Sequence, residues 1–431
     1  MKKKISFALL AIFYLTQVAA QESWSLEECI SHAITNNIQI KQQELNSIQE
    51  KNSLLPSISG NGSYSINWGR SLDVTSNQYL NNRNQSANMS ANASATLFAG
   101  LQKQNNIKLS ELNYQSALQD VEKLKNDISL NIAAAYLQIL LDKEKQLIAQ
   151  EQLKTTAEQL AKTKILVDAG SVTLSAYLDL QAQQATEEVE MVIARNNIAI
   201  SYLNLKQLLD LQTNELFEIE DPTISEPPAI RKSEDINLLF EQNSALRPEI
   251  KAAEYRLLGA KKQLSIAKGA DYPTLSIGGG LSTQYSEAYP NSFSSQFKNN
   301  YYYSLSLRLA IPIFNGWQTR IGIRNSKLNI RGFELQLQQV KNTLYKEIQQ
   351  AEVDAEAALQ RYHASQKNVT ALQESFRYVE QKFSVGMVNT TDYSIAKKNL
   401  ANSQSQLVQA KYQYIFQSKV LEFYQGIPLS L

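Results

Sequence analysis

Few residues of this chain have the types and spacing that catalysis or metal binding requires. The two histidines, His32 and His363, are far apart and have no neighbouring ligand residues, so the sequence predicts no metal site. It contains no glycine-rich phosphate loop, no nucleophile turn and no cysteine–histidine pair. The carboxylates are scattered and mostly interleaved with lysine, which is typical of solvated helix surfaces. We therefore expect neither an enzyme nor a resident cofactor.

Two short turns carry the residues of most interest. Each interrupts a helical pattern with a glycine that can end one helix in a left-handed conformation, and a polar residue that can cap the next helix follows. The sequence thus predicts two helix hairpins, and a functional interpretation adds that their exposed turns contact a partner. The turn residues are Gly170, Ser171, Val172 and Thr173 in the first, and Gly386, Met387, Val388 and Asn389 in the second.

The two turns belong to a unit that occurs twice. The interval from Gly100 to Gly170 equals the interval from Gly316 to Gly386. Each upstream glycine ends a similar motif, Leu97-Phe98-Ala99-Gly100 in one copy and Ile313-Phe314-Asn315-Gly316 in the other. A duplicated unit of this length indicates a symmetric or tubular assembly rather than a single catalytic pocket. We assign residues 21–212 to the first repeat, 213–232 to a proline-containing linker and 233–431 to the second repeat.

The first twenty residues are typical of a secretory signal peptide. Three lysines precede a short apolar run, and Val18-Ala19-Ala20 fits a signal-peptidase site. We expect an exported mature chain that begins near Gln21. The single cysteine, Cys29, cannot form an internal disulfide. It is either a lipid anchor or a half-buried helix residue, and the acidic residues before it favour the second.

Charge is balanced, with 42 basic and 41 acidic residues, and there is no basic patch, so nucleic acid is not an expected partner. The mature sequence has no apolar run long enough for a membrane-spanning helix. If the chain crosses a membrane, it must do so as a closed β-barrel.

Four segments alternate between apolar and polar residues with period two, at 57–68, 87–98, 274–285 and 301–313. Their polar positions are mostly Ser, Asn and Thr, and their length suits tilted membrane strands with a wet lumen on one side. A soluble sandwich also has alternating strands, but two small hairpins bury little core. Aromatic residues near the segment ends resemble membrane-interface rows: Trp68, Tyr285, Tyr301 and Tyr303.

Residues 71–86 and 286–299 are rich in polar residues and are predicted to be solvated loops, and most of the rest of the chain is predicted to be helical. Apolar residues recur in steps of three and four through residues 102–167 and 318–383, with no proline in either stretch. At about 1.5 Å per residue each helix is about 100 Å long, a length that favours coiled-coil packing over a compact globule. Further helices are expected at 26–53, 175–211, 233–268 and 391–424.

Three features together resemble the TolC family of outer-membrane efflux ducts in Gram-negative bacteria, over about residues 24–425. The first is a signal peptide followed by two copies of the helix and hairpin unit. The second is Pro312-Ile313-Phe314-Asn315-Gly316, which is similar to the strand-to-helix signature of the family. The third is Val385-Gly386 followed by Thr391-Asp392, which is similar to the family's tip motif.

The resemblance implies a mainly α fold with a β-barrel part. Three chains would each give four strands to one twelve-stranded transmembrane β-barrel and long antiparallel coiled-coil helices to one periplasmic α-barrel. It also implies a passive exit duct of a tripartite efflux or type I secretion system. The implied partners are two further copies of the chain, a periplasmic adaptor, an inner-membrane transporter and outer-membrane lipid. The implied strand–helix junction residues are Phe98, Gly100, Pro312, Phe314 and Gly316.

The resemblance further implies that the turns contact the adaptor and that acidic residues near them narrow the entrance. Asp392 follows the second turn, but the first turn has Ala176 at the matching position, and Asp179 comes three residues later. Asp179 and Asp392 are therefore the candidate entrance residues. Their alternative role is to cap or solvate the starts of helices.

Other classes of function stay open at this point. A non-conducting helical spacer or adhesin of the envelope is the main alternative, and it needs no lipid-facing strands. An exported enzyme is disfavoured by the missing catalytic residues, and an autonomous porin by the high helix content. The sequence names neither the cargo nor the adaptor.

Overall fold

The computed structural model describes residues 23–49, 57–73, 77–81, 83–212, 217–222 and 236–431. The expected signal peptide and parts of the expected linker, 213–216 and 223–232, lie outside these residues. The chain forms two compact units, and each takes segments from both halves of the sequence. We call residues 1–44, 120–250 and 341–431 the helical unit, and residues 45–119 and 251–340 the strand unit.

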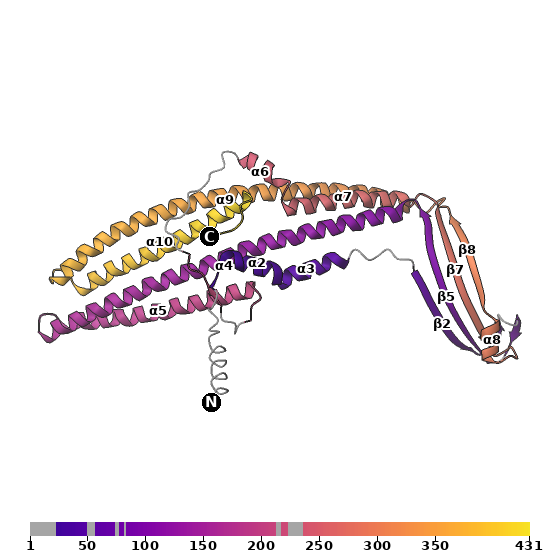
Figure 1. Ribbon diagram of the computed structural model, residues 1–431, viewed down its shortest axis with the longest axis horizontal. Coiled ribbons are helices and arrows are strands. Elements are labelled where there is room, and N and C mark those ends of the chain that lie inside the picture. Colours follow the sequence, from indigo (N-terminus) through magenta and orange to yellow (C-terminus); the bar gives the residue numbers. More distant parts are fainter. Residues whose placement is uncertain (1–22, 50–56, 74–76, 82, 213–216, 223–235) are drawn as a thin grey trace, which may run out of the picture. The chain divides into compact units, whose positions relative to one another are not determined.

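The strand unit contains a four-stranded antiparallel sheet in the order β2 (Ser57–Asn67), β5 (Asn84–Ala99), β7 (Thr274–Ser286) and β8 (Tyr302–Ala310) (Figure 1). Strands from the two sequence repeats therefore pair directly, β5 with β7. In the single chain, β2 and β8 form the two edges of this sheet. A short ladder of β3 (Ser71–Asp73) and β4 (Gln78–Leu80) lies in the connection between β2 and β5.

The strand register puts the apolar positions on one face. Ala91 lies opposite Gly60 on β2 and Leu281 on β7, and Leu281 lies opposite Tyr303 on β8. The next position along the strands brings Ser90, Asn61 and Ser282 together on the other face. On β8 the apolar row is strongly exposed, with Leu305 at 79% and Leu307 at 67%.

Two strand boundaries differ from the prediction by three residues, and one predicted loop contains a helix. Strand β8 ends at Ala310 rather than at residue 313, because its partner β7 begins at Thr274 and because Pro312 has no N–H to donate. Strand β5 begins earlier, at Asn84, since its first residues pair with the end of β2. The connection after β7, expected to be a loop, contains the short helix α8 (Phe293–Asn299).

Two long helices, α4 (Gln102–Asp168) and α9 (Gln318–Ser384), contribute to both units and agree with the predicted ranges within one residue. In the strand unit, α4 packs beside α7 (Pro248–Gly269), where the Ser116 hydroxyl donates a hydrogen bond to the Ala252 carbonyl oxygen at 3.3 Å. None of the described helices is both long enough and apolar enough to cross a membrane.

The helical unit is formed by two hairpins, α4 with α5 (Leu174–Leu208) and α9 with α10 (Thr390–Tyr424), together with α2 (Leu26–Asn36) (Figure 1). Its main core joins α2, α4, α5 and α10, and Ile132 and Leu205 are fully buried there. Cys29 on α2 is 0% exposed in this core, and burial raises the pKa of its thiol to about 12. The structure thus favours the packed helix residue over the lipid anchor, although Cys29 is fully buried rather than half-buried.

Two predicted helices are interrupted. The helix expected at 26–53 breaks at Asn37 into α2 and α3 (Ile38–Gln49), and the Asn37 side chain accepts from the Gln39 N–H and donates to the Leu208 carbonyl oxygen. The helix expected at 233–268 breaks before Pro248 into α6 (Ile236–Ser244) and α7, because a residue that precedes proline avoids the helical region.

The described part of the expected linker, residues 217–222, packs against the helical unit. Strand β6 (Glu218–Ile219) pairs in parallel with β1 (Ser23–Trp24), and the Tyr136 hydroxyl donates to the Glu220 carbonyl oxygen at 2.9 Å. Phe217 and Ile219 are buried in the core of the helical unit. This segment therefore belongs to the helical unit and holds Ser23 and Trp24 against α4.

Candidate functional site

The first turn, between α4 and α5, is a glycine-terminated helix end followed by a capped start. Gly170 has φ +74°, its N–H donates to the Val167 carbonyl oxygen, and the Ser171 N–H donates to the Leu166 carbonyl oxygen. This pair of bonds satisfies carbonyl groups that the helix end leaves open. Thr173 then caps α5 by accepting from the Ala176 N–H at 3.4 Å.

The second turn, between α9 and α10, repeats this geometry. Gly386 has φ +75°, and the N–H groups of Gly386 and Met387 donate to the carbonyl oxygens of Phe383 and Lys382. Asn389 caps α10 by accepting from the Asp392 N–H at 2.8 Å. The caps are thus Thr173 and Asn389, each three residues after the glycine, and the helices begin one residue earlier than predicted.

The two turns differ in the side chains that they expose. Met387 is 77% exposed and Val385 67%, whereas the first turn presents Gly170, Ser171 and Thr173. Val172 and Val388, which occupy equivalent places, are half-buried. The second turn is therefore the more apolar of the two surfaces.

The candidate entrance acids lie in the first two turns of their helices. Asp392 is in the first turn of α10, where a carboxylate is stabilised by the partial positive charge of the helix start. Asp179 lies on α5, one turn beyond the matching position, Ala176, and both acids are exposed. No hydrogen bond found among the described residues joins Asp179 to Asp392.

An aromatic group that the sequence analysis missed supports the second turn. The Tyr393 ring stacks on Phe383 at 4.6 Å and contacts Phe376 at 5.5 Å, so α10 is held against the end of α9. Tyr393 is 1% exposed, and its buried hydroxyl has no hydrogen-bond partner in the described structure. Burial raises its pKa to about 12. The signal in the sequence was the coincidence of aromatic residues on either side of the turn.

A buried ion pair, also missed, connects the two hairpins. The Lys397 ammonium group on α10 lies 3.0 Å from a Glu187 carboxylate oxygen on α5. It also donates to the Gln152 carbonyl oxygen at 2.6 Å and to the Thr156 hydroxyl, both on α4. The Lys397 side chain is 3% exposed, and burial lowers its pKa despite the neighbouring carboxylate. A lysine among buried residues of α10 that are otherwise uncharged was the available sequence signal.

The strand–helix junctions of the two repeats share one backbone feature. Gly100 and Leu101 both have positive φ angles, as do Gly316 and Trp317. Two consecutive left-handed residues turn the chain from a strand into a long helix. A Cβ atom at Gly100 would collide with the backbone of Gly269, so glycine is required there for a close approach as well.

Two aromatic residues at the second junction are exposed. Phe314 is 74% exposed and its ring lies 6.2 Å from that of Trp317. Phe98 is 40% exposed at the end of β5. Pro312 lies just beyond β8, where its missing N–H has no ladder partner.

The predicted interface aromatics lie at the opposite end of the sheet from these junctions. Trp68 directly follows β2, Tyr285 is near the end of β7, and Tyr301 and Tyr303 are at the start of β8. The register brings these strand ends together, because Ser286 pairs with Ser86 and Ser282 with Tyr302. Tyr285 is half-buried against Phe293 of α8, while the other three are 59–82% exposed.

The described residues hold no group of three or more His, Cys, Asp and Glu side chains that is suited to a metal ion. His32 instead packs against Trp24 with ring centroids 4.9 Å apart, and His363 lies beside Tyr362.

Comparisons with known proteins agree with this geometry. The family model described as "Outer membrane efflux protein" matches residues 36–210 and 239–426. The outer membrane protein TolC of Vibrio cholerae is 21% identical over 303 residues, which cover 69% of this chain and 67% of that protein. The TolC of Escherichia coli is 23% identical over 314 residues, which cover 70% of this chain and 62% of that protein. The pyoverdine export outer membrane protein OpmQ of Pseudomonas aeruginosa is 24% identical over 312 residues, which cover 69% of this chain and 62% of that protein. The chain thus spans about two thirds of the length of these relatives.

Solved structures resemble the whole chain. A crystal structure of CusC superimposes with a TM-score of 0.75 at 18% identity and covers 96% of both chains. The open state of the MtrE outer membrane channel of Neisseria gonorrhoeae gives a TM-score of 0.73 at 18% identity, over 96% of this chain and 94% of that chain. At these identities the likeness establishes the fold, in which a four-stranded sheet accompanies long paired helices.

Proposed function

The chain belongs to the family of outer membrane efflux proteins, and from that premise we propose that three copies form a passive exit duct through the outer membrane. The observation that carries this proposal is the two-faced sheet of the strand unit. Its apolar row is exposed on β8, up to 82% at Tyr303, while Ser and Asn occupy the opposite face. An apolar face of this kind suits lipid. The opposite face consists mainly of hydroxyl and amide groups, with Arg308 of β8 as a charged member, and a polar face of this kind suits a wet passage.

The free edges of the sheet support assembly from several chains. A single four-stranded sheet leaves β2 and β8 with unpaired backbone groups, which cannot face hydrocarbon without a large energetic cost. Pairing β8 of one copy with β2 of the next satisfies both edges. With three copies this pairing closes a twelve-stranded barrel. The alternative function, a non-conducting helical spacer of the envelope, would not need a closed barrel.

A conductance measurement tests the duct. The purified full-length protein should require detergent, have the mass of a trimer and produce stepwise ion currents in a planar lipid bilayer. A monomer that stays in solution without detergent, or a trimer that never conducts, contradicts the proposal.

We also propose that the two helix turns contact a periplasmic adaptor linked to an inner-membrane transporter, which supplies the energy. The support is the exposed apolar side chain of Met387 on the second turn, together with the rigid glycine and cap geometry of both turns. Exposed methionines adapt to varied partner surfaces. Met387→Glu should weaken capture of the cognate adaptor on the purified duct, and the equivalent change in the more polar first turn, Ser171→Glu, should weaken it less. Unchanged capture in both variants contradicts the assignment.

We propose further that Asp179 and Asp392 of each chain narrow the periplasmic entrance. Both are exposed and lie within two turns of the tips, and in a trimer they supply six carboxylates. Asp392→Asn with Asp179→Asn should reduce the preference of the single-channel current for cations over anions. An unchanged reversal potential in a salt gradient would assign both acids to the helix starts alone.

A further inference from the structure

Helix α9 begins with a row of basic residues in the strand unit. They recur in steps of four, three and four residues, so at about 3.6 residues per turn they fall within about 60° of arc on one side of the helix. All of them are exposed, whereas Ser326, on another side of the same turns, is 7% exposed. We call this set the basic stripe; its members are Arg320, Arg324, Lys327 and Arg331.

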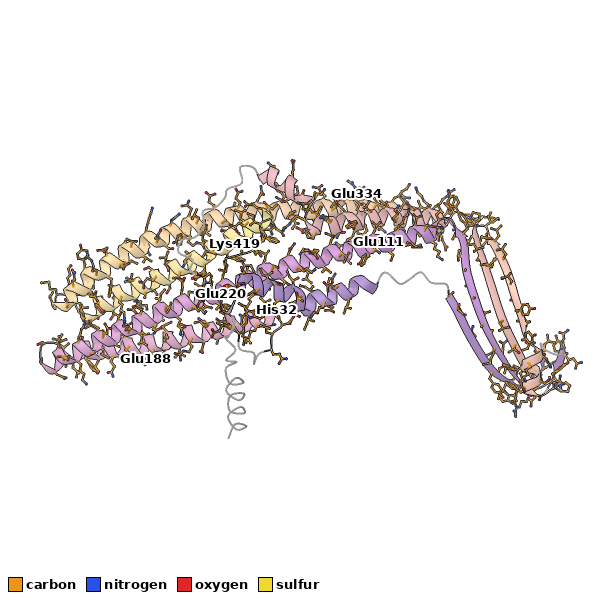
Figure 2. The ribbon with its side chains drawn as sticks, viewed as in Figure 1. His32, Glu111, Glu188, Glu220, Glu334 and Lys419 are labelled. Carbon is orange, nitrogen blue, oxygen red and sulfur yellow. The ribbon has the colours of Figure 1, made fainter. Side chains whose placement is uncertain are left out.

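The near end of the basic stripe is not balanced by acids. The chain as a whole has 42 basic and 41 acidic residues, but residues 288–333 contain neither Asp nor Glu. The first acid of α9 is Glu334, labelled in Figure 2, and it pairs with Arg331 at 2.9 Å. Among the described residues no ion pair is found for Arg320, Arg324 or Lys327. Solvated helix faces usually mix both signs of charge, so a row of one sign favours an anionic partner.

The first copy of the repeated unit shows that the helix does not need these charges to form. Helix α4 is as long as α9 and follows the same kind of junction. Counted from the junction glycines, its matching positions hold one cation, one acid and two amides: Gln104, Lys108, Glu111 and Gln115. Glu111, labelled in Figure 2, accepts a hydrogen bond from Gln115 at 2.9 Å. The basic stripe is therefore a property of the second copy alone and calls for a binding role.

Exposed apolar and aromatic residues lie directly before the basic stripe. Ile313 is 95% exposed and Phe314 74%, just beyond the apolar row of β8. Trp317 is 52% exposed, and its ring lies 6.2 Å from that of Phe314. The guanidinium carbon of Arg320 lies 4.0 Å from the centre of the Trp317 ring. An indole ring beside a long basic side chain is typical of the membrane–water interface, where the ring lies among headgroups and the cation reaches phosphate.

From this arrangement we propose that the basic stripe binds the headgroups of anionic phospholipids, in the membrane leaflet next to the strand–helix junctions. The inference rests on the proposed duct and adds which class of lipid the chain selects and where it binds. Ile313, Phe314 and Trp317 continue the lipid-facing row of β8 up to the first residue of the stripe. This continuity favours lipid over an anionic cargo in the passage, because cations that line a wet passage need no exposed apolar residues beside them.

The contribution of each cation should fall along the helix. One basic residue near an anionic surface strengthens binding about fivefold, and the attraction decays over about 8 Å at physiological salt. At about 1.5 Å per residue, Arg324 lies about 6 Å and Arg331 about 16 Å beyond Arg320. Arg320 and Arg324 should therefore dominate. Arg331, which already pairs with Glu334, should contribute least.

Quenching of Trp317 fluorescence by brominated lipid tests the proposal. The full-length protein carries Trp68→Phe, because Trp68 lies at the opposite end of the sheet. It is reconstituted in mixtures of phosphatidylglycerol and phosphatidylcholine in which one or the other lipid is brominated, and the two quenching curves give the relative affinity of the lipids near Trp317. The remaining tryptophan, Trp24, is present in every sample and adds a common background.

Two triple variants are compared in this assay. The stripe variant carries Arg320→Gln, Arg324→Gln and Lys327→Gln, and glutamine is the residue that the first copy has at the position of Arg320. The control variant removes the same charge from the same helix. It replaces three exposed cations that begin about 60 Å further along α9, at about 1.5 Å per residue: Lys367→Gln, Arg377→Gln and Lys382→Gln.

We expect phosphatidylglycerol to be preferred at least about fivefold in the unchanged and control proteins, and about equally with phosphatidylcholine in the stripe variant. The preference should also disappear in 1 M salt, where the screening length is about 3 Å. If the stripe variant does not insert, Arg320→Gln alone should lower the preference more than Arg331→Gln alone, and equal effects contradict the proposal.

Other outcomes separate this inference from the duct. If the protein conducts ions but the stripe variant keeps the lipid preference, or neither lipid quenches Trp317, the lipid site is wrong and the duct stands. An unchanged lipid preference with a reversal potential shifted towards cations assigns the basic stripe to the passage instead. If the unchanged protein does not insert into bilayers at all, both proposals fail.

Discussion

Replacing Lys397 by methionine should destabilise the helical unit more than any surface change. The Lys397 ammonium group has donor contacts with Glu187, Gln152 and Thr156, which lie on two other helices. The Glu187 side chain is only 11% exposed, so methionine leaves a buried carboxylate without its cation. Breaking a buried pair from one side typically costs about 3–5 kcal/mol. We therefore expect the free energy of unfolding to fall by about 4 kcal/mol.

The double variant Lys397→Met/Glu187→Leu distinguishes charge from packing. Removing both charges removes the desolvation cost of each, and apolar replacement of a buried pair is often neutral or stabilising by about 1–4 kcal/mol. We expect the double variant to recover most of the loss of the single variant. Urea unfolding of the full-length protein in detergent, followed by circular dichroism at fixed protein concentration, measures the free energy of unfolding. It is applied to the unchanged protein, to the single variants Lys397→Met and Glu187→Leu, and to the double variant.

Two outcomes would refute this reasoning. If Lys397→Met costs less than about 1 kcal/mol, the pair is as weak as a surface ion pair, despite its burial. If the double variant is as unstable as the sum of the two single variants, the two residues act independently and the contact is not a coupled pair. The matched control is the ion pair of Lys123 and Asp127, in which both side chains are about half exposed. This pair should contribute little to the free energy of unfolding.

Three further predictions concern Tyr393, the glycines and alkaline pH. Tyr393→Phe removes a buried hydroxyl that has no partner and should raise the free energy of unfolding by about 1 kcal/mol in the same urea assay. Gly386→Ala should lower the free energy of unfolding by only about 1–2 kcal/mol, because the added Cβ meets open space and only the left-handed φ is unfavourable. Gly100→Ala should lower it more and reduce the yield of folded protein, because its Cβ would also collide with the Gly269 backbone. The free energy of unfolding should fall as the pH rises from 9 to 12. In the folded protein the pKa of Cys29 and the pKa of Tyr393 are both about 12, which is above the pKa that each group has in the unfolded chain. The unfolded chain therefore loses these protons first and is stabilised relative to the folded state. In a pH series, Tyr393→Phe should flatten the part of this decline above pH 10, and a slope equal to that of the unchanged protein would contradict the assignment.

Local sequence patterns predicted the long helices well, because apolar residues recur with the helical spacing of three and four residues along the whole length of each helix. The ranges 102–167 and 318–383 differ from α4 and α9 by one residue at the ends. Shorter elements depended on partners that lie far away in sequence. The end of β8 is set by where β7 begins, and the break at Asn37 is stabilised by a bond to the Leu208 carbonyl oxygen.

The candidate sites divide in the same way. The turn glycines and their caps are local, so Gly170 and Gly386 were assigned correctly as helix ends with φ near +75°. The contact between Lys397 and Glu187 joins residues 210 apart in the chain. In the sequence each of these two looks like one more charge on a helix surface, and nothing local shows that both are buried.

The sequence by itself determined the duplication, the strand and helix periods, the two glycine turns and the family. Each of these follows from the order of residue types over short distances, where backbone preference and side-chain period act directly. The tertiary structure alone decided which helix faces are already covered and which are left open. That depends on how α4, α5, α9 and α10 pack, because burial is a property of neighbours and not of a residue. On α5, for example, Leu180 and Leu205 are buried while Leu174 and Leu203 are at least half exposed, although all four are leucines in the sequence.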